Sequence, residues 1–196
     1  MEELYLLSIL PPGEAAGKIG PVREELFRRF GMPSARLLPD SIPAALAPSC
    51  PEPPKEARHR IRVHSEFAVA PAPVTAGGSV FLPLADRRAW DELRSDPLIA
   101  PFRRTSPSGR RQTSVPPFQA FLPYPGIFLG LSSDLPDPRP SLDSMPRAEA
   151  LFGWRKCSLA CIRVTLVPAP DGTPEEWAVK EAVWDIFWEV PVVTRV

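Results

Sequence analysis

The sequence has no long apolar run, no excess of charge of either sign, and few histidines or cysteines. None of its apolar runs reaches the roughly 20 residues that a membrane-spanning helix needs. Glu2 and Glu3 stand where a signal peptide carries positive charge. We therefore expect a cytoplasmic protein with no membrane partner. The 23 basic and 23 acidic side chains cancel, so any nucleic acid must be bound by a local patch and not by a global field.

The chain has three cysteines, Cys50, Cys157 and Cys161, an odd number that does not suit a disulfide framework. Cys157 and Cys161 would lie on one face of a strand about 13 Å apart, which is too far to bridge. No close cysteine or histidine pair with ligand spacing accompanies them. We expect buried thiols in a reducing compartment, with no metal and no cofactor.

Proline is abundant, with 28 residues in a chain of 196. Because proline fixes φ and lacks an N–H group, it suits turns and edge segments, and we expect many short strands and few long helices. A chain of this length with 44% hydrophobic residues can bury one sizeable core or two small lobes that share an interface. We interpret residues 1–196 as a single bilobal domain.

The first half of the chain begins with an apolar strand over residues 4–10. A helical pattern over 16–30 follows, with apolar residues on one face, and Gly31 ends it. This helix either kinks at Gly20-Pro21 or begins at Pro21, where proline is tolerated. A second strand is expected near 36–38, leading into 42–46.

The second half follows the same order. It has a strand over 79–84, a short helix that Asp86 can cap, and apolar strand material over 118–131. Residues 4–46 and 79–131 therefore form a weak internal repeat of strand, helix, strand. An extended segment over 58–69 lies between the two halves.

The end of the chain predicts one more short helix and a closing pair of strands. Residues 145–152 are helical in pattern, with Ser144 as the cap. Residues 159–167 and 178–190 are rich in β-branched and aromatic residues and predict an antiparallel pair. On the last strand, four residues at period two share one face, which favours sheet core over a base-stacking platform. They are Trp184, Ile186, Trp188 and Val190.

The order of these elements and several local sequences resemble the two-histidine phosphoesterases of the LigT or 2′-5′ RNA ligase-like kind. Residues 4–12 are similar to the opening strand of that family, and 23–26 to the end of its first helix. Residues 79–93 resemble the strand and helix before its second motif, and 154–190 its closing hairpin. The resemblance implies an α+β fold in which two antiparallel sheets face each other across a central cleft, with helices outside.

Both positions at which this family carries its His-x-Thr motif hold other residues. Pro43 and Ala45 occupy the first pair of positions, and Gly126 and Phe128 occupy the second. In the family each His exchanges a proton with an RNA hydroxyl or leaving oxygen, and each Thr or Ser steadies the phosphate. Loss of one such His removes acid–base catalysis of about 10²- to 10⁴-fold, so loss of both is expected to leave little beyond binding.

The remaining histidines, His59 and His64, are five residues apart on an extended segment and point to opposite faces, so they cannot grip one phosphate together. The one local basic patch lies in 101–117, which contains no acidic residue. If the resemblance holds, its arginines overhang the cleft and pair with RNA phosphates; the alternative is a solvated loop. They are Arg103, Arg104, Arg110 and Arg111.

These observations lead to three hypotheses. The first is a catalytically degenerate relative of the phosphoesterases that binds RNA ends, a nucleotide or a protein partner in the ancestral cleft. The second is an active RNA 2′,3′-cyclic phosphodiesterase that uses non-standard residues, with His59 or His64 recruited. The third is a structural or interaction module that contacts a partner through an exposed apolar edge and has no nucleic-acid ligand.

Overall fold

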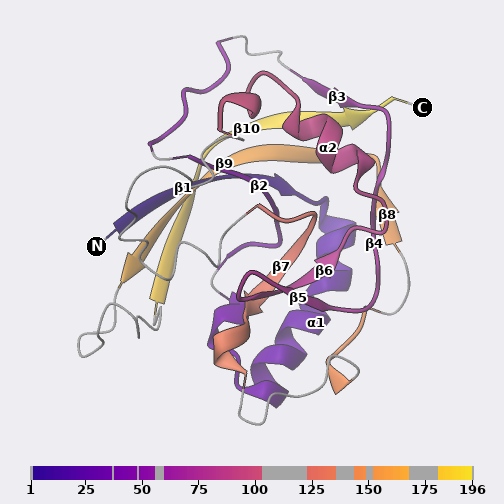
Figure 1. The fold of residues 1–196 in the computed structure, drawn as a ribbon, viewed down its shortest axis with the longest axis vertical. Coiled ribbons are helices and arrows are strands. Elements are labelled where there is room, and N and C mark those ends of the chain that lie inside the picture. The colour runs from indigo at the N-terminus through magenta and orange to yellow at the C-terminus, as the bar shows by residue number, and fades with distance from the viewer. Residues whose placement is uncertain are drawn as a thin grey trace.

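The computed structural model has an α+β fold, in which two α-helices and ten strands lie within the described residues (Figure 1). The predicted fold class is confirmed. No helix in these parts of the chain combines the length and the apolar character needed to cross a membrane. The structure describes residues 2–36, 38–47, 49–55, 60–102, 123–135, 144–148, 152–167 and 181–195.

The largest sheet, called the central sheet below, has five strands in the order β2-β1-β9-β10-β3. Its pairings are antiparallel except for β10 with β3, which are parallel. The long β9–β10 ladder confirms the predicted closing pair. The bounds are β1 Glu2–Leu10, β2 Ile42–Ala47, β3 Ile61–Val63, β9 Lys156–Val167 and β10 Glu181–Thr194.

A second sheet has three antiparallel strands in the order β5-β6-β7. Gly77 and Gly78 form the turn between β5 and β6 with φ of 55° and 82°, a backbone conformation that favours glycine. A separate pair, β4 and β8, is held by the stacked rings of Phe67 and Trp154, whose centroids lie 6.1 Å apart. The bounds are β4 Phe67–Val69, β5 Val74–Ala76, β6 Ser79–Pro83, β7 Gly126–Leu131 and β8 Phe152–Trp154.

Helix α1 spans Gly13–Phe30 as one helix that includes Pro21, so the alternative in which it begins at Pro21 is wrong. The N–H groups of Ala15 and Ala16 donate to the Pro12 carbonyl and close the first turn. Gly31 ends the helix in the left-handed conformation, as the sequence predicts. The apolar face is buried at Ala15, Ile19, Val22 and Leu26.

Helix α2 spans Arg88–Arg94 and buries Trp90 and Leu93. The N-cap of α2 is Arg87 and not Asp86 as predicted, but the Asp86 carboxylate still accepts a hydrogen bond of 2.9 Å from the Arg88 N–H in the first turn. Three short 3₁₀ helices lie wholly within the described residues. They are η1 Pro33–Arg36, η2 Ala100–Phe102 and η3 Ser132–Asp134.

The buried residues form two clusters on opposite faces of the three-stranded sheet. Phe81 and Phe128 pack with Leu6 and Ile162 of the central sheet in one cluster. The neighbouring residues on β6 and β7 point the other way and join a cluster that contains the apolar face of α1. The three-stranded sheet is therefore covered on both faces, as its continuous apolar sequence requires.

Two of the predicted local elements are wrong. Arg36 lies in η1 and not in a strand. Residues 145–148 are not helical; the Ala148 N–H donates instead to the Pro71 carbonyl at 3.1 Å, and strand β8 begins at Phe152. Both segments are held by contacts with residues far along the chain, which a local pattern does not contain.

Candidate functional site

The two strands that correspond to the motif positions lie side by side. β2 and β7 form the facing edges of the central sheet and the three-stranded sheet. The Phe128 N–H donates to the Ser41 carbonyl at 3.1 Å, and the Tyr124 N–H donates to the Pro43 carbonyl at 3.3 Å. These bonds run in antiparallel order, so the two segments meet through backbone contact. The cleft that the resemblance implies stays a prediction.

All four motif positions are buried. Ala45 and Phe128 have 0% of their surface exposed, and Pro43 and Gly126 are buried as well. The indole N–H of Trp90 donates to the Pro43 carbonyl at 3.3 Å from inside the core. None of the four side chains titrates or donates a hydrogen bond, so none of them can act as a general acid or base or donate to a phosphate.

Aromatic rings occupy the neighbourhood of the second motif. The Phe81 ring packs edge-to-face on Phe128 with centroids 5.9 Å apart and stacks on Tyr124 at 4.4 Å. The resemblance implies a hydroxyl at the position of Phe128. Here that position is filled by a ring whose packing joins β6 to β7.

Gly126 has no room for a side chain. A Cβ atom built there would lie 2.7 Å from the Leu82 carbonyl oxygen and 3.0 Å from the Pro83 Cα, both backbone atoms of β6. A third contact, at 3.1 Å, is with the Tyr124 ring. A histidine at this position would therefore require β6 to move away from β7.

We expect Gly126→Ala to lower the free energy of unfolding by about 1–3 kcal/mol, because the extra methyl group overpacks a backbone contact. Urea denaturation followed by tryptophan fluorescence measures the change. Gly17→Ala is the matched control: its Cβ meets nothing within 4 Å and lies in a helix, so it should leave stability unchanged or raise it. Equal stability of Gly126→Ala and the wild type would contradict the close β6–β7 contact.

The predicted basic patch lies outside the described residues. This applies to all four of its arginines, Arg103, Arg104, Arg110 and Arg111, and to His59. His64 is described and exposed, as expected, and its backbone N–H donates to the Glu92 carboxylate. The predicted phosphate contacts stay a prediction.

The prediction that all three cysteine thiols are buried is wrong for one of them. Cys161 is buried and Cys157 is half-buried, but Cys50 is exposed, because the segment around it lies at the surface. Burial raises the pKa of the Cys157 and Cys161 thiols to about 12, so neither is a ready nucleophile. Over the described parts of the chain, no group of three or more metal-ligating side chains is close enough to hold a metal ion.

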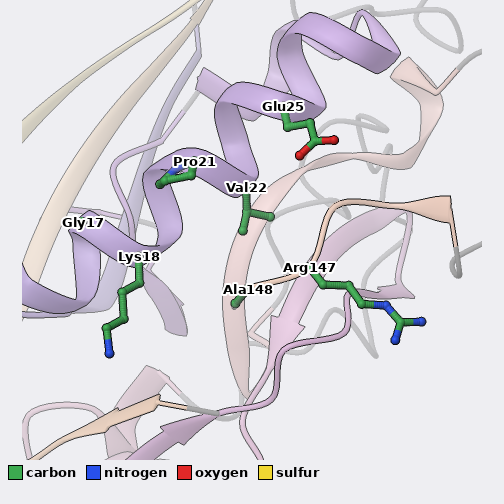
Figure 2. A pocket seen from close by; sticks show the side chains of 7 residues that line it. All are labelled: Gly17, Lys18, Pro21, Val22, Glu25, Arg147 and Ala148. Carbon is green, nitrogen blue, oxygen red and sulfur yellow. The ribbon is translucent and has the colours of Figure 1, made fainter. Parts of the chain in front are cut away.

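A small pocket of about 140 Å³ lies between α1 and the segment at residues 147–148 (Figure 2). Its side chains carry both signs of charge, and Figure 2 shows Lys18 and Arg147 extending away from each other. The volume is well below the roughly 300–1,000 Å³ typical of ligand sites. The pocket is lined by Gly17, Lys18, Pro21, Val22, Glu25, Arg147 and Ala148.

A larger pocket of about 350 Å³ lies between α1 and residues 35–36 and 38–40, beside an ion pair. Arg23 Nη1 and Asp40 Oδ1 are 2.8 Å apart, and their side chains are only 12% and 19% exposed. Arg23 Nη2 also donates to the Leu38 carbonyl at 2.7 Å. Burial raises the pKa of the Asp40 carboxyl and lowers the pKa of Arg23, while their mutual attraction opposes both shifts. Trp184 of β10 forms part of the pocket wall.

Strand β10 contains a β-bulge that the sequence did not reveal. Ile186 pairs with Ile162, but Trp188 pairs with Cys161, so Phe187 is an extra residue in the ladder. An extra residue reverses the alternation of side chains along a strand. The two halves of β10 therefore present their period-two residues to opposite faces of the central sheet.

The prediction that four residues of β10 share one core face is wrong for this reason. Trp184 and Ile186 precede the bulge and are 39% and 42% exposed. Trp188 and Val190 follow it and pack against the core cluster that contains α1. In the sequence, the adjacent aromatics Phe187 and Trp188 indicate the bulge, because a regular strand with one buried face does not place two large rings in succession.

Phe187 itself lies on the other exposed face. Its ring is 49% exposed and packs edge-to-face on Tyr5, with centroids 6.0 Å apart. The Arg163 guanidinium lies 5.0 Å from the Phe187 ring centroid and pairs with Asp185 at 2.7 Å. Val183 is 56% exposed. Large apolar side chains are thus exposed on both faces of the first half of β10.

Comparisons with known proteins add no family to this description, since no family model, no curated protein and no solved structure matches the chain.

Proposed function

We propose that the protein is a non-catalytic binding protein whose scaffold is like that of the two-histidine phosphoesterases. The supporting observation is the chemistry and burial of the motif positions. Pro43, Ala45, Gly126 and Phe128 offer no acid, base or donor, and they lie where β2 and β7 are in direct contact. General acid–base catalysis needs a titratable group within hydrogen-bond reach of the reacting atom, and these side chains supply none.

The partner proposed here is another protein, and the proposed location of the complex is the cytoplasm. The support is the surface of β10, where Val183, Trp184, Ile186 and Phe187 are exposed. Clustered large apolar side chains of this kind are characteristic of sites that contact another protein. Binding of RNA ends or of a nucleotide depends on the predicted basic patch, and it enters the tests below as a competing outcome.

Incubation with a 2′,3′-cyclic nucleotide, and with short RNA that ends in a 2′,3′-cyclic phosphate, tests the absence of catalysis. We expect no product above the uncatalysed rate, as measured by chromatography of the products. An active cyclic phosphodiesterase serves as the positive control.

Turnover at ordinary enzyme rates of about 1 s⁻¹ or more would contradict the proposal. In that case the double variant His59→Ala/His64→Ala decides whether either histidine has been recruited. Loss of turnover in this variant assigns the activity to them, and unchanged turnover assigns it to other residues.

A further inference from the structure

Much of β10 forms an open edge of the central sheet. β10 pairs with β9 along almost its whole length, but β3 covers only Val192–Thr194 on the other side. Within the described residues, no strand pairs with this side of 181–191. In an antiparallel ladder, alternate residues direct their N–H and C=O groups away from the paired neighbour. This side of 181–191, called the β10 edge below, therefore carries backbone groups available to another strand.

The side chains of the same segment are apolar and exposed on both faces. Trp184 and Ile186 lie on the face of their partners Val164 and Ile162, whereas Phe187 lies on the face of Tyr5. Figure 1 shows the start of β10 beside the end of β9. An added strand would gain hydrogen bonds to the β10 edge and apolar contacts above and below the sheet.

The charges of β10 distinguish between two kinds of added strand. The charged residues of 183–194 are Asp185 and Glu189, both acidic and both exposed. Arg163 is the cation next to Asp185, and it also lies 3.7 Å from Glu3, so one cation is shared by two carboxylates. Glu189 forms no ion pair with any described residue. The surface is therefore both apolar and acidic.

A second copy of this chain fits poorly. In the two-fold antiparallel register that pairs the whole of 181–189, Asp185 would face Asp185 of the other copy. Like charges directly opposite each other in a sheet are destabilising. A strand with basic residues opposite Asp185 and Glu189 and apolar residues between them complements both the charge and the exposed rings.

We propose that the β10 edge binds an extended, basic and apolar segment of another polypeptide by strand addition. This inference rests on the proposed function in one respect, since both assign the binding of another protein to the exposed surface of β10. Trp184 of this segment forms one wall of the pocket of about 350 Å³, whose other walls come from α1 and residues 35–36 and 38–40; in this arrangement the pocket receives a side chain of the added strand. Specificity then comes from that pocket and from the spacing of the basic residues.

The test uses a library of random 12-residue peptides displayed on phage and selected on the whole protein. We expect the selected peptides to be rich in β-branched or aromatic residues and to carry Lys or Arg about three residues apart, because the bulge places the β9 partners of Asp185 and Glu189, Arg163 and Ala160, at that spacing. The best sequence is then synthesised with a fluorescent label, and its affinity is measured by anisotropy.

Two variants locate the binding. Ile186→Lys should weaken the labelled peptide at least about tenfold, because it puts a charge into the centre of the apolar contact. Glu189→Lys should weaken it less, and the loss should shrink as salt is raised. Thr75→Lys is the matched control, since Thr75 is exposed on a strand of the other sheet; its affinity should equal that of the wild type. Thermal melting confirms that each variant is folded.

The other outcomes overturn the proposal. Equal binding of the peptide to Ile186→Lys and Thr75→Lys, or no enrichment in the library, removes the β10 edge as the site. A dimer of the wild type in sedimentation velocity that Ile186→Lys abolishes assigns the edge to a second copy. Salt-sensitive binding of labelled RNA that Ile186→Lys abolishes assigns the edge to nucleic acid. The turnover assay on cyclic phosphates is independent, so failure here is distinct from failure of the non-catalytic proposal.

Discussion

Phe128→Thr, which introduces the hydroxyl residue that the resemblance implies at this position, is expected to destabilise the protein by about 3–5 kcal/mol and to confer no activity. Phe128 is fully buried and packs on Phe81 in the cluster between the two larger sheets. Removal of the ring leaves a cavity there, and the threonine hydroxyl would be buried in apolar surroundings. The free energy of unfolding from urea denaturation measures the loss.

Phe187→Thr is the control for the same chemical change at an exposed ring. Phe187 is half exposed, so its replacement should cost at most about 1 kcal/mol, in the range of surface substitutions and of one aromatic pair. A Phe128→Thr variant as stable as Phe187→Thr would show that the second motif position is open to solvent. The account of a filled site would then be wrong.

Arg23→Met is expected to lower the free energy of unfolding by about 3 kcal/mol, because it leaves the Asp40 carboxylate largely buried without its cation. The pair is mostly shielded from water, and the Leu38 carbonyl loses a donor as well. The double variant Arg23→Met/Asp40→Leu removes both charges and should recover most of the loss. Chemical denaturation of the two single variants and the double variant gives the coupling between the residues.

Arg29→Met is the matched control. Arg29 pairs with Glu25 at 3.3 Å on the same helix, but its side chain is 59% exposed. Exposed pairs of this kind contribute at most about 1 kcal/mol. Equal losses in Arg23→Met and Arg29→Met would mean that the Arg23–Asp40 pair is solvated, and that α1 does not enclose it.

The elements that the sequence predicts well are those whose signal is local. The apolar face of α1 with Gly31 behind it, and the β-branched run of β9, follow from periodicity and from turn chemistry. Segments held by distant partners were missed. In η1, the Ser34 N–H donates to the Asp134 carboxylate and the Ser34 hydroxyl accepts from the Leu131 N–H. Both partners lie about a hundred residues further along the chain.

In the candidate site, too, local features could be predicted from the sequence and contacts between distant segments could not. Periodicity alone gave no reason to place Pro43 beside Tyr124, and only the family resemblance predicted that the two segments would be neighbours. The bulge at Phe187 depends on register against β9, which a single strand does not specify. Sequence reasoning therefore assigned Trp184 and Ile186 to the core, although they form an exposed surface.

Amide hydrogen exchange at Tyr124 and Phe128 tests the central claim most directly, because their N–H groups form the β2–β7 contact that closes the motif positions. The account predicts slow exchange at Phe128, comparable to that of the central strands β1 and β9, and measurable protection at Tyr124. Rapid exchange at both amides, with β1 and β9 still protected, would show that β2 and β7 stand apart around an open cleft.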